Sequence, residues 1–466
     1  MARHGSSLAY KDENEHRTRS EHLGAFSEMA RWEDLSPEAK EALKIRTLDS
    51  LGCAFGALMA VPAKALREEI DAFGGSPLCT MVGGGKTSPD RAAFYNGALV
   101  RYLDFNDSYL AKGETCHPSD NLGAVLAAAE YRGTTGKEFL TALALSYQVH
   151  CRLSDVAPVR HRGFDHTTQG AFAVAAGCGK ALGLDAFRIA HALGISGASN
   201  IALRVTRTGA LSHWKGLAYP NTAFNGLRAA FLAMRGITGP LEVFEGTKGW
   251  MQAVSGAFVL DWSLEDLERV LRTIVKKYNA EIHSQSAIEG LPEMMKEEGF
   301  LGEEVDRIRV DIFDVAHLII GGGAEGDKTV VRTKEEADHS LPYILAVAAL
   351  DGKVMPAQYA EARIGRDDVQ SLLRRVTVVP DPEYTGRFPG EHACRITVSL
   401  SNGREIRREK RDYEGFHTRP MGWERVEEKF HALSREALPP GRRDAIVTAV
   451  KQLDHLTVRE FTSLLG

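Results

Sequence analysis

Residues 170–182 read GAFAVAAGCGKAL, a run of small and apolar residues that ends just before Gly183. An apolar run of this length that stops at a glycine is typical of an α-helix. Because nearly every face of this helix is apolar, we expect it to be buried among other helices, and its small residues allow those neighbours to pack closely. This stretch therefore predicts a large helical assembly.

The helical pattern extends on both sides of this stretch, from about Pro37 to about Arg235. Ser36 and Pro37 supply a capping residue followed by proline at the first helical position. No fixed-period repeat accompanies the pattern, which argues against a solenoid. Further helices are predicted at residues 42–59, 122–131, 137–153, 186–195 and 221–235.

The pattern changes after about Leu264. Residues 305–312 (VDRIRVDI) alternate polar and apolar side chains, as a half-buried strand does. Asn402 and Gly403 separate two further strand-like runs, which is a strong signal for a β-hairpin. With the interleaved helices, these runs predict a small α+β domain with an antiparallel sheet. The other elements predicted here are strands at 374–379, 395–400 and 405–410 and helices at 284–299 and 340–350.

The sequence thus predicts a mainly α protein, and its length of 466 residues favours two domains. Residues 25–268 and 412–466 form the predicted all-helical domain, because two helical runs between residues 423 and 456 are expected to pack back on it. Residues 269–411 form the predicted α+β domain. The polar residues 1–24 are predicted to be disordered.

The bulk composition narrows the class of protein. A net charge of −5 argues against the basic surface of a nucleic-acid-binding protein. The six cysteines show no C-x-x-C pair and no metal-type spacing, so we expect reduced residues in a reducing compartment. The N-terminus has no apolar signal segment, and no run approaches the roughly 20 apolar residues that span a bilayer. We therefore predict a cytoplasmic protein without nucleic-acid or membrane partners.

A polar cluster lies at a predicted helix boundary in residues 96–119, NGALVRYLDFNDSYLAKGETCHPS. Carboxylate, amide, hydroxyl and imidazole groups in one place suit proton transfer on a small polar substrate. An aspartate-rich helix end followed by an N-cap gives the same pattern, so both interpretations remain open. The cluster comprises Asp104, Asn106, Asp107, Ser108, His117 and Ser119.

Three histidines, His117, His166 and His283, precede predicted helices, where backbone N–H groups and the helix dipole favour an anionic ligand. Their spacing contains neither H-x-x-x-H nor H-E-x-x-H, so we predict no metal site. Tyr343, one turn into an apolar helix, either fills the core or directs its hydroxyl group into a site. Cations in loops are candidates for binding carboxylates or for proton transfer. These cations are Arg204, Lys215 and Lys276.

Six motifs resemble the MmgE/PrpD family and occur in the order of that family. The resemblance implies a large all-helical domain closed by the C-terminal segment, with the α+β domain of residues 269–411 as a lid. It also implies a homodimer that needs no metal and no organic cofactor. The motifs are LDFNDSYLAKGETCHPSDN (103–121), GFDHTTQGAF (163–172), LSHWKGLAYPNTAFNG (211–226), KKYNAEIHSQSAIE (276–289), ADHSLPYILAVAALDG (337–352) and YEGFHTRPMGWERVEEKF (413–430).

The family contains 2-methylcitrate dehydratase, cis-aconitate decarboxylase and iminodisuccinate epimerase. FNDSYLA and HPSDN, together with AEIHSQSAIE, resemble the dehydratase branch, which implies dehydration of 2-methylcitrate or a related small tricarboxylate. The same pocket chemistry serves decarboxylation or epimerisation, and a non-enzymatic helical dimer that binds small acids is a further alternative. Asn279 departs from the pattern, because many members have proline at this position.

The resemblance also implies roles for single residues. His117 and His166 are expected to transfer protons, and Asp104 is expected to orient or tune one imidazole. Lys215 and Lys276 are expected to bind carboxylates. The remaining catalytic prediction is Tyr343, for the leaving group. The predicted substrate-binding residues are Asn106, Asp107, Ser108, Ser119, Arg204, His283 and Gln285, and Glu281 is expected to face the same cleft.

Overall fold

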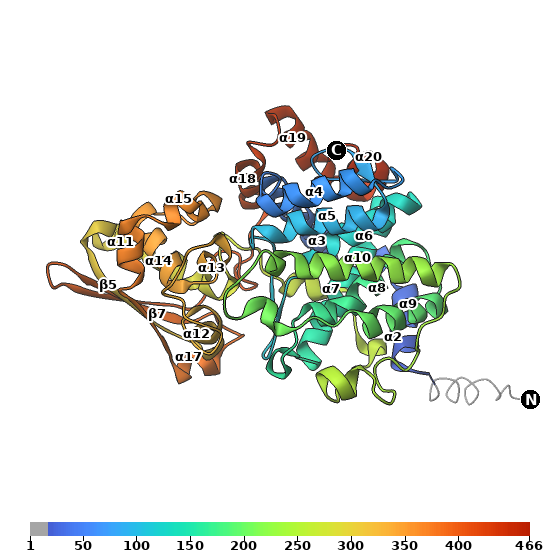
Figure 1. Cartoon of the computed structure of the whole chain (residues 1–466), viewed down its shortest axis with the longest axis horizontal. Helices are drawn as coiled ribbons and strands as arrows, with labels where there is room; N and C mark the ends of the chain where they lie inside the picture. Colours follow the sequence, from blue (N-terminus) through green and yellow to red (C-terminus); the bar gives the residue numbers. More distant parts are fainter. Residues whose placement is uncertain (1–16) are drawn as a thin grey trace, which may run out of the picture.

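The computed structural model describes residues 17–466 as a large helical part beside a smaller part that holds the main sheet (Figure 1). Residues 1–16 of the predicted disordered segment lie outside the described residues. Residues 19–24 of that segment are helical instead and belong to α2 (Arg19–Met29). The Thr18 side chain caps this helix, and the Glu21 carboxylate accepts from the Thr18 backbone N–H, so local capping outweighs the polar composition.

Helix α8 (Thr167–Ala181) is buried along almost its whole length and packs against α2, α6, α7, α9 and α10, which confirms the prediction from its small residues. The packing is close: a Cβ atom on Gly177 would lie 1.8 Å from Ser146 Oγ of the neighbouring α7. The other helices of this part are α3 (Pro37–Gly56), α4 (Val61–Phe73), α5 (Pro89–Tyr102), α6 (Leu122–Arg132), α7 (Gly136–Val156), α9 (Ala186–Ser199) and α10 (Trp214–Met234), with two short strand pairs, β1 (Cys79–Thr80) with β2 (Lys86–Thr87) and β3 (Tyr109–Leu110) with β4 (Thr115–Cys116).

Capping signals in the sequence predicted the start of helix α3 correctly but not the start of helix α10. Ser36 Oγ accepts a hydrogen bond from the Ala39 N–H and Pro37 opens α3, as predicted. Helix α10, however, begins at Trp214 rather than near residue 221, and Pro220 lies inside it. An interior proline removes one backbone hydrogen bond, and the packing of α10 against α5 and α8 retains the helix. Lys215 therefore lies in the first turn of a helix and not in a loop.

The smaller part contains a four-stranded sheet in the order β6-β5-β7-β8. Strands β5 (Val305–Ile312), β7 (Cys394–Leu400) and β8 (Glu405–Lys410) are antiparallel, and the turn before β8 contains the predicted Asn402 and Gly403. Strand β6 (Val376–Pro380) is parallel to β5, so the sheet is mixed rather than antiparallel. The chain crosses over between β5 and β6 through helices, and such a crossover brings the second strand back in the same direction.

Helices cover this sheet and complete a second core. Helix α11 (Gln285–Glu298) packs on β7 and β8, and the nearly apolar α14 (Leu341–Asp351) packs on β6 and α11. This apolar cluster runs from Ala280 to Ile406 and is separate from the helical core. The remaining helices are α12 (Asp314–Ile320), α13 (Lys334–Ala337), α15 (Glu361–Ile364), α16 (Asp367–Leu373) and α17 (Pro382–Arg387).

The C-terminal segment returns to the helical part (Figure 1). Helix α18 (Trp423–Ser434) packs against α3, and α19 (Pro440–Lys451) follows it there. The last helix, α20 (Val458–Thr462), contacts α6. The apolar side chains of these helices belong to the same core as α3 to α10.

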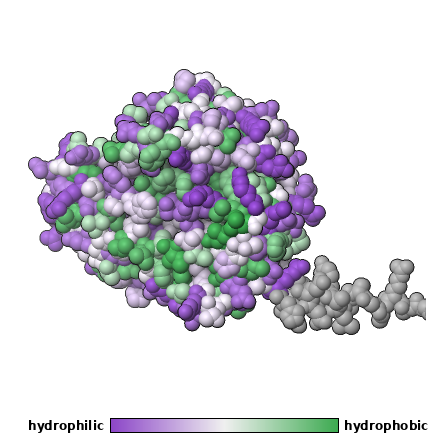
Figure 2. Space-filling model, turned by 45° about the vertical axis from the view of Figure 1, so that its right-hand side comes forward, coloured by the Kyte–Doolittle hydropathy of each residue, from purple (hydrophilic) through white to green (hydrophobic). Residues whose placement is uncertain are grey.

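The surface mixes hydrophilic and hydrophobic residues, with hydrophobic patches visible on one face (Figure 2). Within residues 17–466, no helix combines the length and the apolar character that crossing a bilayer requires. All six cysteines are buried, and none of them forms a disulfide bond.

Candidate active site

A small cavity of about 30 Å³ lies where the helical part meets the smaller part, which we call the lid (residues 269–411). Its walls come from both parts and carry mainly charged and imidazole side chains. Because buried charges are tolerated only when they are paired, the pairings decide what chemistry is available. The lining residues are Arg101, Asp104, Thr115, His117, Arg160, His166, Arg204, Arg207, Glu281, Ile319 and His339.

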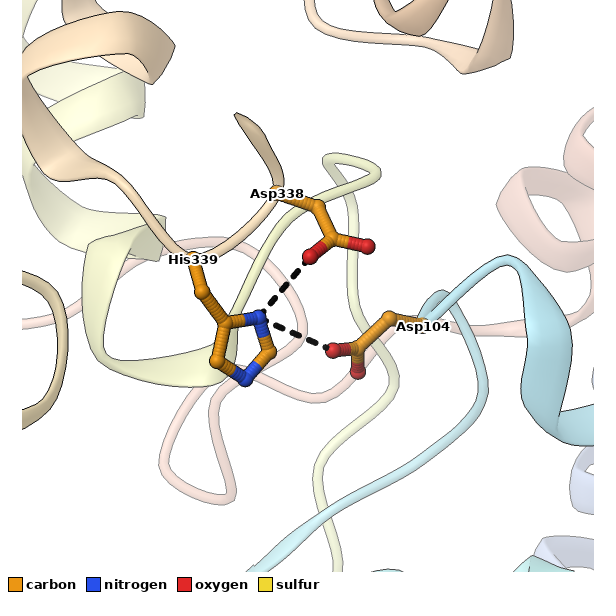
Figure 3. A group of neighbouring side chains, drawn as sticks. All are labelled: Asp104, Asp338 and His339. Carbon is orange, nitrogen blue, oxygen red and sulfur yellow. Dashed lines mark hydrogen bonds and ion pairs between the residues drawn. The ribbon is translucent and has the colours of Figure 1, made fainter. Parts of the chain in front are cut away.

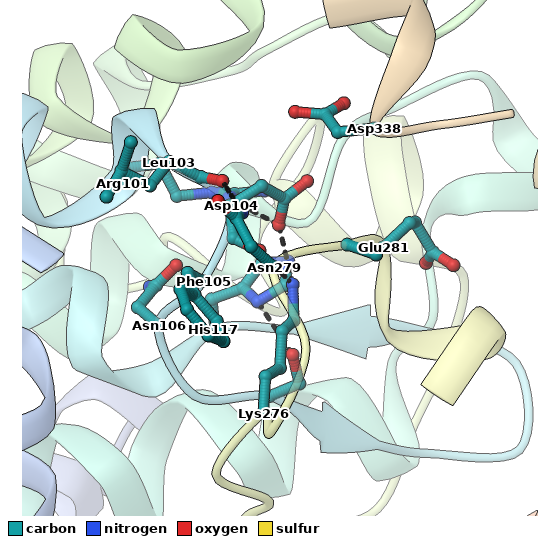
Figure 4. Close-up of polar contacts among 12 residues, drawn as sticks. Arg101, Leu103, Asp104, Phe105, Asn106, His117, Lys276, Asn279, Glu281 and Asp338 are labelled. Atoms are coloured by element: carbon teal, nitrogen blue, oxygen red, sulfur yellow. Dashed lines mark hydrogen bonds and ion pairs between the residues drawn. The ribbon is translucent and has the colours of Figure 1, made fainter. Parts of the chain in front are cut away.

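Asp104 follows the end of α5 with a φ angle of 56°, a left-handed conformation that is uncommon for residues other than glycine. Its Oδ1 accepts hydrogen bonds from Arg101 Nη1 at 2.8 Å and from Lys276 Nζ at 2.7 Å (Figure 4). Burial by itself would raise the pKa of Asp104, but the charges of Arg101 and Lys276 hold that pKa well below its ordinary value. Asp104 is therefore an ionised carboxylate clamped between two cations.

His117 lies between β4 and the short helical turn Pro118–Asn121. Its Nδ1 is 2.8 Å from the Asp107 carbonyl oxygen and 3.0 Å from Ser108 Oγ. A carbonyl oxygen can only accept, so these partners place the proton of the neutral ring on Nδ1 and leave the Nε2 lone pair free. Burial lowers the pKa of His117 well below its ordinary value, and the charge of Arg101 lowers it further. The ring is thus neutral and able to accept a proton.

His166 immediately precedes α8, and its ring meets that of His117 edge to face, with centroids 5.4 Å apart. Its Nδ1 is 3.4 Å from Asp165 Oδ1, and Asp165 Oδ2 accepts a hydrogen bond from Arg207 Nε at 2.6 Å. Burial lowers the pKa of His166 well below its ordinary value, although the Asp165 carboxylate opposes this shift. Nε2 has no hydrogen-bond partner among the described residues, so it can exchange a proton with a ligand.

Asp104, Asp338 and His339 bring three potential metal ligands within 4.8 Å of one another (Figure 3). The ammonium group of Lys215 lies among them, with Nζ 2.5 Å from Asp338 Oδ1, 2.9 Å from His339 Nδ1 and 3.6 Å from Asp104 Oδ2. Burial lowers the pKa of Lys215 to about 8, and the charges of Asp338 and Asp104 limit the shift. The lysine already supplies the positive charge that a cation would bring to this cluster.

Four guanidinium groups line the cavity, and each is paired with a buried carboxylate. Arg101 pairs with Asp104, and Arg207 pairs with Asp165. Arg160 Nη2 is 3.4 Å from Glu114 Oε1, and Arg204 Nη2 is 2.8 Å from Glu325 Oε1 of the lid. Planar guanidiniums can share further N–H groups with a second carboxylate, so the wall is suited to an anionic ligand with several carboxylates.

Comparison with known proteins covers both parts of the chain. Sequence profiles of the MmgE/PrpD N-terminal domain and of the MmgE/PrpD C-terminal domain match residues 21–263 and 278–455. The chain belongs to the MmgE/PrpD family. Both matched domains border the cavity, and the gap between the two matches coincides with the end of the helical part.

Several relatives cover most of the chain. The 2-methylcitrate dehydratase of Escherichia coli (strain K12) is 26% identical in an alignment 458 residues long that covers 90% of this chain and 91% of that protein. The 2-methylcitrate dehydratase of Cupriavidus necator is 27% identical and covers 94% of this chain and 95% of its own length. The cis-aconitate decarboxylase of Mus musculus is 25% identical in an alignment 395 residues long that covers 79% of this chain and 76% of that protein. The family therefore includes proteins named for two different lyase reactions.

Some of the residues that the MmgE/PrpD resemblance predicted as catalytic line the cavity, and others lie behind its wall. Asp104, His117 and His166 line the cavity together. Lys215 and Lys276 do not line it; they lie behind Asp104 and hold its carboxylate. The carboxylate-binding role predicted for the lysines is therefore better suited to the four arginines, which face the cavity directly.

Tyr343 is not part of this site. Its hydroxyl group donates to the Gln358 carbonyl oxygen, and its ring lies in the core of the lid. The rotation of α14 about its own axis places the Tyr343 ring in the apolar core of the lid. Of the two positions left open by the sequence, this structure has Tyr343 in the core, because sequence spacing does not fix the rotation of a helix that is apolar on all faces.

Most predicted substrate-binding residues support the site from behind. Among them only Arg204 lines the cavity. Ser108 contacts the His117 ring, the Asn106 amide donates to Ser119 Oγ, and the Asp107 carboxylate accepts from the Ser119 N–H. These contacts fix the loop that carries His117, so these side chains shape the site in this conformation.

The lid residues predicted to bind substrate are also set back. His283 Nδ1 is 2.7 Å from Glu281 Oε1, and the ring packs among aromatic side chains. The Gln285 amide donates to the Tyr278 carbonyl oxygen, which braces the loop before α11. Of this motif, only Glu281 reaches the cavity. Burial alone would raise the pKa of Glu281, but the charge of His283 holds it at about 2.

Sequence reasoning missed Arg101, Arg160, Arg207 and His339 as cavity residues. Arg101 carries a usable signal, since it lies three residues before Asp104 and therefore on the same side of the helix end. Arg207 shares its signal with Arg204, from the same short helical turn. Arg160 reaches the site only through tertiary contacts and no local pattern marks it, whereas His339 lies in the 337–352 motif next to Asp338.

Proposed function

We propose that this protein is a lyase that removes water from 2-methylcitrate, or from a closely related tricarboxylate, without a metal or an organic cofactor. One observation carries the proposal: two neutral imidazoles face each other in a cavity lined by four guanidiniums. The imidazoles can move protons, and the guanidiniums can hold carboxylates. The names of the relatives from Escherichia coli and Cupriavidus necator support the substrate.

Binding of such a substrate requires the lid to move. Ligand pockets have volumes of roughly 300–1,000 Å³, whereas this cavity has about 30 Å³. Arg204 of the helical part and Glu325 of the lid are joined by an ion pair across the boundary. We infer that the lid is closed here, and that a substrate enters when this boundary opens.

Dehydration breaks a C–H bond next to a carboxylate and a C–O bond at the neighbouring carbon. His117 is the proposed base, because its Nδ1–H donates to the Asp107 carbonyl oxygen and its Nε2 carries a free lone pair. As the proton leaves, negative charge develops on the adjacent carboxylate, and guanidiniums such as that of Arg101 stabilise it. The electron pair of the broken C–H bond becomes the new double bond, and the hydroxyl group departs.

His166 is the proposed acid that protonates the departing hydroxyl group, which then leaves as water. Asp165 lies 3.4 Å from its Nδ1 and stabilises a protonated ring, whereas His117 has only neutral partners there. A bound tricarboxylate adds negative charge to the cavity and raises the pKa of His166 toward neutrality. The unpartnered Nε2 is the atom that would deliver the proton.

Decarboxylation of cis-aconitate is a second candidate, because the Mus musculus relative of that name is nearly as similar as the dehydratases. That reaction also needs carboxylate binding and a proton donor for the carbon that loses CO₂. The two reactions differ in what leaves the substrate, so product analysis separates them.

The test is to incubate the purified protein with 2-methylcitrate, citrate and cis-aconitate separately, and to follow ultraviolet absorbance and product mass. Dehydration predicts rising absorbance from 2-methylcitrate and a product lighter by one water. A His117→Gln/His166→Gln double variant serves as the control and should be inactive. CO₂ release from cis-aconitate without dehydration would transfer the assignment to the second candidate, and no reaction with any of the three would refute both.

A further inference from the structure

A buried ammonium group outside the cavity connects the C-terminal helix α18 to the site. Lys429 Nζ is 2.6 Å from Asp49 Oδ1 of α3, and it donates to the carbonyl oxygens of Phe105 at 2.7 Å and of Lys276 at 2.9 Å. The same ammonium lies 3.7 Å from the centroid of the Phe105 ring. Two of the three N–H donors of the ammonium therefore go to backbone carbonyl oxygens, and its charge is paired with the Asp49 carboxylate.

The two carbonyl groups belong to the segments that carry the Asp104–Lys276 pair. Phe105 directly follows Asp104, and the other carbonyl is that of Lys276 itself (Figure 4). Lys276 Nζ in turn donates to both Oδ1 and the backbone oxygen of Asp104, each at 2.7 Å. Two links therefore join the Asp104–Phe105 segment to Lys276. Lys276 Nζ contacts Asp104 directly, and Lys429 bridges the carbonyl oxygens of Phe105 and Lys276.

The conformation of Asp104 makes this second link important. Its φ angle of 56° is unfavourable for a residue with a Cβ atom and persists only where surrounding contacts fix it. Arg101 and Lys276 fix the Asp104 carboxylate through their side chains, and Lys429 fixes the next carbonyl group from the side of the core. Among the described residues, no hydrogen bond or ion pair joins Lys429 to a residue that lines the cavity.

We propose that Lys429 is a positioning residue, which holds Asp104 and Lys276 in register through the carbonyl oxygens of Phe105 and Lys276. The proposal rests on the proposed function only for its kinetic readout. It assigns to the C-terminal segment a role in the site itself, in addition to completing the helical core.

The test compares two charge-neutral double variants. Lys429→Met with Asp49→Asn removes the ammonium and its carboxylate together, which avoids leaving an unpaired buried charge. The matched control is Lys44→Met with Asp454→Asn, because Lys44 also joins α3 to the C-terminal segment, with Nζ 2.8 Å from Asp454 Oδ1. Lys44 has no contact with the segments that hold Asp104 and Lys276.

Hydrogen exchange provides a readout that does not depend on turnover. The Lys429 double variant should exchange faster than wild type in residues 104–110 and 273–280, whereas the control should leave both segments unchanged. Equal protection of both segments in wild type and in the Lys429 variant would overturn the proposal, whatever the substrate is.

With the substrate identified as above, the Lys429 double variant should lower kcat by about 10²-fold with little change in KM, as expected when reacting groups are misplaced by about 1 Å. The acidic limb of its pH profile should also move upward, because Lys276 is then held less firmly near His117. Lys429→Arg should restore part of kcat, since it keeps the charge but not the compact ammonium geometry. A kcat equal to that of the Lys44 control would overturn the positioning role, whereas an inactive wild type would refute the proposed function alone.

Discussion

The rings of His117 and His166 meet at an interplanar angle of 70° with their centroids 5.4 Å apart, although the two residues come from different loops. The Nδ1 atom of His117 faces a carbonyl oxygen, and that of His166 faces a carboxylate. Two side chains of the same type therefore experience different electrostatic environments within one cavity. Such a pair can divide the roles of base and acid between its members.

Loss of either imidazole should abolish most of the activity. His117→Gln and His166→Gln should each lower kcat by roughly 10²–10⁴-fold, because each ring is proposed to transfer a proton. His191→Gln is the matched control, since that buried ring lies on α9, hydrogen-bonds to the Gly239 backbone, packs on Phe187 and does not line the cavity. Steady-state kinetics with the identified substrate checks the prediction. Near-normal turnover in both site variants would remove these histidines from the mechanism.

The dependence of kcat/KM on pH should have its alkaline limb near the pKa of Lys215, which burial lowers to about 8. Above that pH the ammonium becomes neutral, and Asp104 and Asp338 lose one of their compensating charges. On the acidic side, activity should persist below pH 6.5, because burial keeps the His117 ring neutral. In the Lys215→Met variant no limb near pH 8 should remain. If an alkaline limb near pH 8 remains in the Lys215→Met variant, a group other than Lys215 causes that limb.

Stability should fall as the solution becomes acidic. Burial lowers the pKa of His150 and of His339 to about 4 and that of His392 to about 3, against 6.5 in an unfolded chain. Because the unfolded state binds these protons first, the stability contributed by the neutral rings is complete above pH 6.5 and is lost as the pH falls toward 4. Urea unfolding across this range should show a decreasing free energy of unfolding.

The contribution of one ring can be isolated in the lid. His392→Gln should flatten the decline by on the order of a few kcal/mol, since one pKa unit corresponds to about 1.4 kcal/mol. His392 lies outside the cavity and contacts Ser286 Oγ, so its substitution tests stability apart from chemistry. An unfolding free energy that is constant between pH 6.5 and 4 would contradict the neutral state of these rings.

Removal of metal ions should leave the activity unchanged, because Lys215 already supplies a positive charge among Asp104, Asp338 and His339. Activity before and after dialysis against a chelator, with metal analysis of both samples, checks this prediction. Activity that disappears on chelation and returns with one divalent ion would show that the cluster binds a metal in the working enzyme.

We also propose that the protein is a homodimer. Hydrophobic side chains are exposed on α4, where Val61 and Phe73 are 67% and 69% accessible, and on α10, where Trp214 is 45% accessible. Light scattering on a sizing column should give twice the chain mass of 51.0 kDa. A single-chain mass at micromolar concentration would contradict the proposal.

Local sequence patterns predicted several secondary-structure elements correctly. The alternation in residues 305–312 predicted β5 with its observed bounds, and Asn402 with Gly403 predicted the turn before β8. Ser36 and Pro37 located the start of α3. Each of these signals acts within a few residues, through capping, turn geometry or side-chain alternation, so the sequence alone is sufficient to recognise it.

Non-local choices were not predictable in the same way. The parallel pairing of β6 with β5 depends on a crossover through several helices, and α10 continues through Pro220 because neighbouring helices hold it. Tyr343 faces the lid core instead of the cavity for a similar reason, since only packing sets the rotation of α14. These outcomes depend on contacts between distant segments rather than on the residues themselves.

For the site, the sequence by itself determined which chemical groups are present, and its motifs marked Asp104, His117, His166 and Arg204. Only the tertiary structure decided which of them face one another and which cations reach the cavity. It placed Lys215 and Lys276 behind Asp104, and it brought Arg101, Arg160 and Arg207 to the wall. The reason is physical: residue type fixes what a side chain can do, whereas burial and the charges packed around it fix its protonation state and its partner.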